Sequence, residues 1–531
     1  MFLKKNFNNK NYLSIVIFFF ALLINQFSGN RGVFPIDSFS HFDTGYRILV
    51  GDMPFRDYWV VSGPLVDFLQ AFIFLITGVN WQNYLLNASI LNGIVAVLSY
   101  RLFLSFKLNQ IFSFFYAICF AILAYPLSGT PFVDLHSVHF SIISVYLYIF
   151  AIRTEKLKYW FLLPIFLLFA FLSKQVPAAY IGFSIFLLII YEFVLNKKVK
   201  NFSIFFTLAK STSLFLILIS IFFYLNSINL QIFFDQYINY PREIGGNRIF
   251  NTNYNFKNTI LDFKFIHIIF LLLLVLNSRN FFKNKNFYKE KKFKIFLISL
   301  FLFLSLIQHQ ILTKNQEFIF FLIPLFSALV HIDLFDFKHK YKKYLIYFLL
   351  SFCLFTTFKY HLRYNLEKKF HELDRVSFEN TVKGEVIDKK FKGLNWITPG
   401  KKTQEEVEAE IKSIKEIYEI LKNDNQKKML FTNYSFFSVL LEDSVNSTSR
   451  WFPGDDSAFP IKESKFYNNY KNFLLNLIKS KKIIHFYVIS DINEKNLLDY
   501  LPLECLDKVK VHNDLLKFKI NDKCQYLYGK L

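Results

Sequence analysis

Eleven apolar stretches, separated by short polar segments, dominate the first two thirds of the chain. About 20 mostly apolar residues in a helix cross the hydrocarbon core of a bilayer. The sequence therefore predicts an α-helical polytopic membrane protein with about 11 transmembrane helices. The expected spans cover residues 11–28, 82–104, 110–127, 138–152, 158–173, 176–195, 202–225, 263–277, 294–312, 317–334 and 344–358.

One further apolar stretch, residues 64–79, differs from these eleven. Asp67 and Gln70 interrupt it, so we expect it to lie along the membrane surface as an amphipathic helix.

The basic residues are distributed unevenly. Of the net charge of +22, +18 lies in the first 359 residues, between the apolar stretches. With a cytoplasmic N-terminus, the lysine-rich segments 279–294 and 338–343 would both be cytoplasmic, as the positive-inside rule requires. An odd number of spans then places the C-terminal domain outside the cytoplasm. Together with the family resemblance given below, this implies a multi-pass protein of a bacterial inner membrane with a periplasmic C-terminal domain. The same distribution argues against nucleic acid as a partner.

The chain divides into a membrane part, residues 1–358, and a C-terminal part, residues 359–531. The C-terminal part alternates helical and strand patterns, which predicts a small soluble α/β domain. Cys505 and Cys524 lie in this domain and could pair if it faces an oxidising compartment. The expected elements are helices at 405–422 and 465–479 and strands at 428–432, 483–489 and 515–520.

Three segments on the outer side are rich in polar residues: 29–81, 128–139 and 226–262. Loops on a rigid scaffold commonly carry function. In the first of them, Asp37 follows the first span closely, and His41 and Asp43 come next. Acidic groups at a membrane face can act as general bases, bind a divalent cation or stay solvated.

A longer pattern follows Asp37 in this loop. Residues 49–59 read LVGDMPFRDYW, and Gly63 and Pro64 open the expected surface helix. The loop resembles that of the C-type (GT-C) membrane glycosyltransferases, which include bacterial aminoarabinose transferases and eukaryotic protein mannosyltransferases. Asp37 stands at the acidic position of that pattern, whereas Ser38 replaces the usual second acid.

The resemblance implies a glycosyltransferase that moves a sugar from a polyprenyl-phosphate donor to a lipid, glycan or protein acceptor. Asp37 would be the catalytic base, with Asp43 and His41 as supporting or alternative acid–base groups. Ser173-Lys174-Gln175 is similar to a Lys-Gln pair found at the outer end of a span in bacterial relatives, so Lys174 could face the lipid phosphate.

Arg242 and Arg248 flank Gly245-Gly246 in the third outer segment. Two guanidinium groups around a permissive backbone could hold a phosphate. The alternative is an ordinary flexible loop with interfacial arginines.

The second outer segment offers Asp134, His136 and His139 as metal ligands or acceptor contacts. Oxygen and imidazole ligands could hold a divalent metal, but no zinc-type spacing is complete, and no other cofactor is expected. Residues 446–456 of the C-terminal domain include Arg450 and Trp451, a pair suited to carbohydrate. A turn packed on its own domain is the simpler interpretation, and no catalytic role is assigned there.

Two other classes of membrane protein remain as alternatives. A multi-span transporter or flippase would carry its functional charges near the bilayer midplane and often has internal repeats, whereas the suggestive acids here lie in an outer loop and no repeat is found. A lipid-linked oligosaccharide polymerase or ligase would rely on arginine-rich outer loops and lacks the acidic first-loop pattern.

Overall fold

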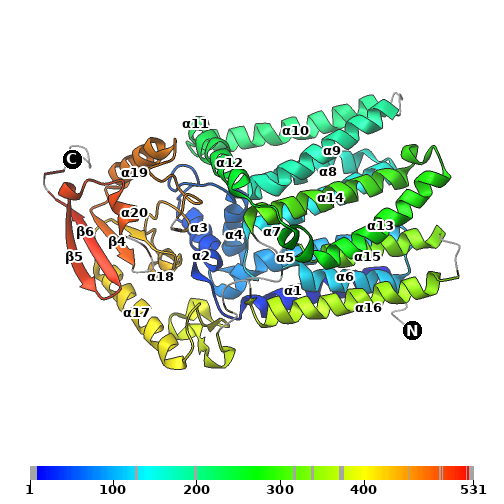
Figure 1. Cartoon of the computed structure of the whole chain (residues 1–531). Helices are drawn as coiled ribbons and strands as arrows, with labels where there is room; N and C mark the ends of the chain where they lie inside the picture. The colour runs from blue at the N-terminus through cyan, green and yellow to red at the C-terminus, as the bar shows by residue number, and fades with distance from the viewer. Residues whose placement is uncertain are drawn as a thin grey trace, which may run out of the picture.

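The computed structural model describes residues 9–125, 129–195, 200–314, 319–336, 340–369, 373, 376–453, 455–489, 492, 494–521 and 523–524. Within these ranges the chain forms a bundle of long helices joined at one end to a smaller part that contains the strands (Figure 1). Part of the expected cluster 338–343 and of the segment 128–139 lies outside the described residues.

Each of the eleven expected spans corresponds to a helix of the bundle. In the described part of the chain, eight helices are long and apolar enough to cross a membrane, and α6, α8 and α15 are shorter apolar helices. The protein is therefore a multi-pass membrane protein. The helices are α1 (Asn9–Gly29), α5 (Trp81–Ser105), α6 (Gln110–Ala124), α7 (Val133–Thr154), α8 (Leu157–Ser173), α9 (Gln175–Leu195), α10 (Lys200–Leu225), α13 (Lys264–Lys283), α14 (Lys291–Thr313), α15 (Leu322–Asp333) and α16 (Lys342–Tyr360).

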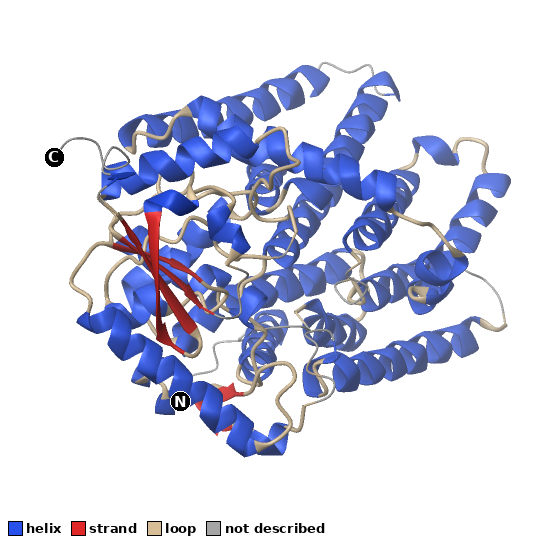
Figure 2. Ribbon diagram, turned by 60° about the vertical axis from the view of Figure 1, so that its left-hand side comes forward, coloured by secondary structure: helices blue, strands red, loops and turns tan. Residues whose placement is uncertain are grey.

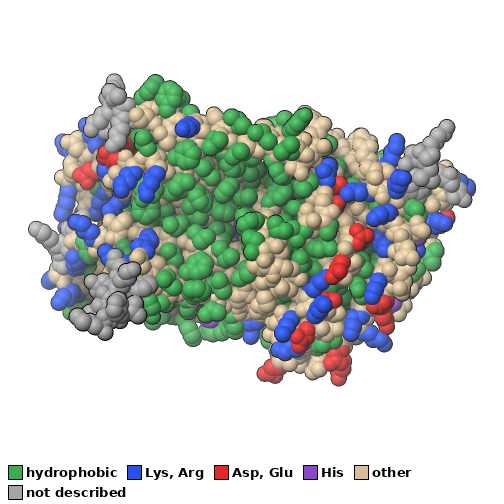
Figure 3. Space-filling view, turned by 180° about the vertical axis from the view of Figure 1, so that it is seen from behind, with side chains coloured by type: hydrophobic (Ala, Val, Ile, Leu, Met, Phe, Trp, Pro, Cys, Tyr) green, Lys and Arg blue, Asp and Glu red, His purple; other side chains and the backbone are tan. Residues whose placement is uncertain are grey.

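The surface of the bundle agrees with this assignment. Figure 3 shows a broad apolar belt between two charged ends. Large apolar side chains such as Phe183, Ile217 and Leu354 are more than half exposed on the outward faces of α9, α10 and α16. Exposed apolar area on this scale marks a lipid-facing surface.

The last span is longer than expected. The α-helix α16 continues as the π-helical turn η5 (His361–Leu366), so that the helical segment runs from Lys342 to Leu366, past the expected boundary at residue 358.

Short helices cover the end of the bundle next to the strands. Helix α4 is the stretch expected at the membrane surface, and its buried Asp67 and Gln70 face inward, away from solvent. The third outer segment, expected to be a loop, is mostly helical. These elements are α2 (Pro35–Ser38), α3 (Ser40–Leu49), α4 (Pro64–Thr77), α11 (Leu230–Phe234), η1 (Asp235–Asn239), α12 (Tyr240–Asn251) and η2 (Lys257–Leu261).

The C-terminal part contains a four-stranded sheet in the order β3-β4-β6-β5. β3 and β4 are parallel, whereas β4–β6 and β5–β6 are antiparallel. The expected strands and both expected helices are present, and β5 is an additional strand that was not predicted. The main elements are α17 (Gln404–Asn423), β3 (Lys428–Phe431), α18 (Phe437–Leu441), α19 (Tyr467–Lys481), β4 (His485–Ile489), β5 (Leu506–His512) and β6 (Leu515–Ile520).

Smaller elements complete this part. A two-stranded antiparallel sheet, β1 (Val382–Lys383) with β2 (Asn395–Trp396), precedes α17. The short helical turns are η3 (Phe287–Lys289), η4 (Leu334–Asp336), η7 (Phe378–Asn380), η8 (Gly384–Val386), η9 (Lys389–Phe391), α20 (Lys495–Leu498) and η10 (Leu503–Cys505).

Helices pack on both faces of the four-stranded sheet (Figure 2). Because side chains alternate along a strand, Leu430 joins α17 on one face, and Met429 and Phe431 join α19 on the other. The α/β domain expected from the sequence is thus present. Cys505 and Cys524 form a disulfide in it.

The α/β domain is packed firmly on the outer helices. The apolar cluster on the α17 side also contains Phe39 and Phe42 of α2–α3 and Trp81 of α5. The cluster on the α19 side contains Trp59 and Tyr240. The two parts therefore share their hydrophobic cores, and side chains of both can contribute to one site.

Candidate active site

A cavity of about 740 Å³ lies where the outer ends of the spans meet the α/β domain. Five segments far apart in the sequence form its wall: α2–α3, the start of α7, the α8–α9 junction, α12 and the end of α14. A loop of the α/β domain closes one side. The polar residues lining the cavity include Asp37, Ser40, His41, Asp134, Lys174, Gln175, Arg242, Arg248, His309 and Trp451.

Asp37 lies in the single turn of α2, which Pro35 begins. Its carboxylate lines the cavity and has no hydrogen-bond or ion-pair partner among the described residues. Burial raises the pKa of Asp37 to about 7, and the negative charge of Asp134 acts in the same direction, against the positive charge of Lys174. Such a carboxyl group is half ionised near neutral pH, which suits a general base.

Lys174 follows the last residue of α8, where the backbone becomes extended. Its Nζ donates to both oxygens of Asp134 at 2.7 Å. Oδ1 of Asp134 also lies 2.7 Å from His309 Nε2 on α14. Lys174 is therefore held in position at the cavity by a buried acid, and Asp134 serves as its counter-charge.

The neighbouring Gln175 fixes the wall of the cavity. Its side-chain amide donates to the carbonyl oxygens of Val61, at 2.9 Å, and Tyr237, at 2.6 Å. Within the Lys-Gln pair, Lys174 thus places a cation at the cavity, and Gln175 links the first and third outer segments by hydrogen bonds.

Arg242 and Arg248 lie on helix α12 and not in a flexible loop. Both line the cavity, are exposed, and have no ion-pair partner among the described residues. Gly245 and Gly246 lie between them, and a Cβ atom built on either would meet nothing within 4 Å. Each glycine in a helix lowers the stability of the helix by about 1 kcal/mol relative to alanine. Here the two glycines leave open space between two cations.

His41 is attached to a buried cluster around Asp67. His41 Nδ1 lies 2.7 Å from Asp67 Oδ1. Because burial lowers the pKa of His41, its ring is neutral near pH 7 and its Nδ1–H donates to the carboxylate. Nε2 then remains able to accept a hydrogen bond at the cavity that His41 lines.

The α/β domain contributes to the same cluster. Arg450 Nη2 and Nε donate to Asp67 Oδ2 at 2.7 Å and 3.1 Å, and Nη1 donates to the Ser62 carbonyl oxygen. Trp451, the next residue, lines the cavity. The loop expected to be a turn packed on its own domain therefore also packs into the site, and the pairing of Arg450 with Asp67 was not predicted.

Asp43, expected as a supporting acid–base group, does not line the cavity. Its Oδ1 accepts a hydrogen bond from the Ser438 backbone N–H at 3.2 Å. Burial raises the pKa of Asp43, with Arg47 opposing the shift. The structure thus places Asp43 in the contact between α3 and α18, separate from Asp37.

His136 and His139 are also buried away from the cavity lining. His136 contacts Asn87 and Tyr125, and His139 Nδ1 lies 2.5 Å from the Leu135 carbonyl oxygen. Among the described residues no group of three His, Cys, Asp or Glu side chains could hold a metal ion. Asp134 alone of this expected set reaches the cavity, and its partners are Lys174 and His309.

His309, which lines the cavity, and Asp67, which contacts His41, were not predicted as site residues. Each is a polar residue within an apolar stretch, and such residues in membrane proteins usually have a buried partner or a function. That rule would have singled out both, but neither partner could be identified from the sequence.

No protein-family model matches the chain, and neither does any curated protein. Among solved structures, the chain is similar to the crystal structure of ArnT from Cupriavidus metallidurans bound to undecaprenyl phosphate. The TM-score is 0.48 and the sequence identity 10%, and the similarity covers 98% of each chain.

Proposed function

We propose that the chain is a membrane glycosyltransferase of the C type, which transfers a sugar from a polyprenyl-phosphate donor to an acceptor hydroxyl. The observation that carries this proposal is the cavity that Asp37 lines together with Arg242 and Arg248. Among the residues that the structure describes, the Asp37 carboxylate has no partner and the two arginines have no counter-charge. The first-loop pattern around Asp37 points to the same reaction.

The chemistry requires a base near the acceptor. Asp37 takes the proton of the acceptor hydroxyl while the hydroxyl oxygen forms a bond to the anomeric carbon of the sugar. A carboxylate with a pKa of about 7 holds a proton more strongly than an ordinary aspartate, and general-base catalysis gains from that match with the operating pH.

The bond that breaks joins the anomeric carbon to the lipid phosphate, which leaves as an anion. Arg242 and Arg248 are placed to stabilise that charge, because guanidinium groups bind phosphate oxygens in pairs. Lys174 adds a third cation, which Asp134 orients. The glycines between the arginines leave room for the phosphate to approach the helix.

The position of the cavity fits a substrate that is half lipid. Apolar residues of membrane helices, including Tyr180 on α9 and Leu312 on α14, line one part of it. Trp451 and Ser457 of the α/β domain line another, and an aromatic ring beside polar groups suits a sugar. We assign the cavity to the outer face of a bacterial inner membrane, since the lysine-rich loops lie at the opposite end.

The most direct test compares lipid-linked glycans by mass spectrometry in a wild-type strain and in a strain that lacks this chain. The proposal predicts that a polyprenyl-phosphate sugar accumulates and that one glycan, lipid or protein loses that sugar. Restoring the wild-type chain should reverse both changes, whereas the Asp37→Asn variant should not. Identical profiles in the two strains would contradict the proposal.

A further inference from the structure

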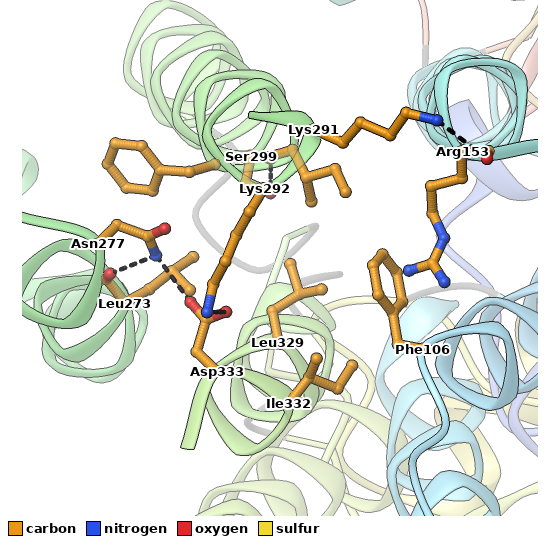
Figure 4. A pocket seen from close by; sticks show the side chains of 12 residues that line it. Phe106, Arg153, Leu273, Asn277, Lys291, Lys292, Ser299, Leu329, Ile332 and Asp333 are labelled. Atoms are coloured by element: carbon orange, nitrogen blue, oxygen red, sulfur yellow. Dashed lines mark hydrogen bonds and ion pairs between the residues drawn. The ribbon is translucent and has the colours of Figure 1, made fainter. Parts of the chain in front are cut away.

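A second cavity, of about 350 Å³, lies at the end of the bundle remote from the α/β domain. It is formed by the C-terminal end of α7, the N-terminal end of α14, and parts of α13 and α15. Figure 4 shows basic side chains on two sides of it and apolar side chains between them. The glycosyltransferase proposal does not involve this cavity.

One side of the cavity carries the positive charge of Arg153. Arg153 Nη2 donates to the Ser105 carbonyl oxygen at 2.6 Å, and the guanidinium group lies 3.7 Å from the centre of the Phe106 ring. Among the described residues it has no carboxylate partner. The remaining N–H groups can therefore donate to an anion.

Lys291 stands beside Arg153. Its Nζ lies 2.9 Å from Glu155 Oε1, and about half of each side chain is exposed. An exposed pair of this kind contributes little stability. Lys291 can therefore turn toward an anion held by Arg153 at low cost.

The opposite side of the cavity holds the one acid that lines it. Lys292 Nζ lies 3.1 Å from Asp333 Oδ1, and Asn277 donates to Asp333 Oδ2 at 2.7 Å (Figure 4). This carboxylate is neutralised by its own lysine. The lining therefore keeps a positive charge from Arg153, to which Lys291 adds when it turns away from Glu155.

Between the two sides the cavity wall is apolar. Leu329, Ile332, Phe296 and Leu273 are among the residues that form it. A small inorganic anion would gain nothing from such a wall, whereas glycerol and the first methylene groups of an acyl chain would be buried against it.

We propose that this cavity binds the phosphate headgroup of an anionic phospholipid of the adjacent leaflet. Arg153 and Lys291 hold the phosphate oxygens, and Leu329, Ile332 and Phe296 contact the glycerol and the upper acyl chains. Basic pockets between membrane helices are recognised lipid headgroup sites. This cavity combines basic side chains for the phosphate with an apolar wall for the glycerol and acyl chains.

The test is a titration of the purified full chain with phosphatidylglycerol or phosphatidylcholine, followed by native mass spectrometry. We expect phosphatidylglycerol to bind at least about tenfold more tightly. Arg153→Gln should weaken its binding about tenfold and reduce the preference for phosphatidylglycerol over phosphatidylcholine. Lys283→Gln, which removes an exposed charge at the end of α13, is the matched control and should bind as the wild type does.

If Arg153→Gln does not fold, Lys291→Gln replaces it, because Lys291 is exposed and its loss leaves no buried charge. Equal binding of the two lipids, or equal weakening in Lys283→Gln, would overturn the proposal. A second series uses inorganic phosphate as the competitor. If millimolar phosphate displaces phosphatidylglycerol, the site takes a soluble phosphate and the lipid assignment is wrong.

Discussion

Arg450 and Asp67 are separated by 383 residues, yet Arg450 Nη2 lies 2.7 Å from Asp67 Oδ2, and their side chains are 1% and 0% exposed. One belongs to the α/β domain and the other to the surface helix α4. The pair therefore joins the two parts of the protein directly behind the cavity, and Asp67 in turn orients His41.

We expect Arg450→Met to destabilise the protein, because it leaves the buried Asp67 carboxylate without its strongest partner. Breaking a buried ion pair typically costs about 3–5 kcal/mol. The thermal unfolding midpoint in detergent should fall, and limited proteolysis should release the α/β domain.

The exposed pair of Lys427 and Asp443, whose closest atoms are 3.9 Å apart, provides the control. Lys427→Met should leave the midpoint within experimental error. If Arg450→Met is as stable as this control, the buried pair does not hold the two parts together.

Arg242→Gln and Arg248→Gln should weaken use of the polyprenyl-phosphate donor without affecting folding, since both side chains are exposed. Losing one charge-assisted hydrogen bond costs roughly 1.5–3 kcal/mol, so the KM for the donor should rise by about ten- to a hundredfold. Steady-state kinetics with the variants in vesicles measures this effect. Lys257→Gln, which removes an exposed cation outside the cavity lining, should retain the wild-type KM, and an unchanged KM in both arginine variants would exclude them as phosphate ligands.

Gly246→Leu tests whether donor binding needs the open space beside the two glycines of α12. The structure shows no atom within 4 Å of the added Cβ, and leucine favours a helix over glycine by about 1 kcal/mol. The variant should therefore fold at least as well as the wild type. If the space receives the donor, binding of donor should nevertheless fall, as an equilibrium titration would show. Normal donor binding would mean that the space between the arginines is not used.

Asp37→Asn should increase stability, and by an amount that depends on pH. The folded protein raises the pKa of Asp37 to about 7, so the folded state loses stability relative to the unfolded chain as pH rises from about 4 to about 7. Asparagine has no charge to bury and so removes this pH-dependent destabilisation. The free energy of unfolding of Asp37→Asn should exceed that of the wild type by about 1–3 kcal/mol at pH 8 and by little at pH 4.

Asp52→Asn should do the opposite. Burial alone would raise the pKa of Asp52, but Arg47 and Lys481 outweigh it and hold the pKa at about 2. This carboxylate therefore stabilises the fold at neutral pH, and its loss should lower the unfolding midpoint. Thermal unfolding at pH 4 and pH 8 compares the two variants, and a lower midpoint for Asp37→Asn at pH 8 would contradict the pKa on which its role depends.

Much of the fold could be predicted because hydrophobicity determines it. The eleven apolar stretches became the eleven helices, and strand β6 has the bounds that its pattern predicted, Leu515–Ile520. The structure of α12 was missed, because Gly245 and Gly246 indicate a loop unless the surrounding contacts are known. Helix propensity is a weak guide where tertiary packing decides.

The site was only partly predictable, for a different reason. Asp37 and Lys174 were identified from the resemblance of the first loop and of the Lys-Gln pair, and Arg242 and Arg248 from their positions beside two glycines. The structure places all four around one cavity. The contacts between the site residues were not predicted. Asp134 was expected as a metal ligand or acceptor contact and not as the partner of Lys174, and His309 and Arg450 reach the site through long-range packing. Asp43 follows His41 by two residues in the sequence, but it lies outside the cavity lining and contacts Ser438 of the α/β domain, a long-range contact that the sequence does not reveal.

The central claim is that Asp37 is the base for sugar transfer, and the rate of transfer by Asp37→Asn in reconstituted vesicles tests it most directly. Asparagine keeps the size of the side chain but cannot take a proton, so the rate should fall by about 10²–10⁴-fold while donor binding persists. The wild-type rate should decrease about tenfold for each pH unit below about 7, as the carboxylate becomes protonated, and level off above it. A rate for Asp37→Asn close to that of the wild type would contradict the claim.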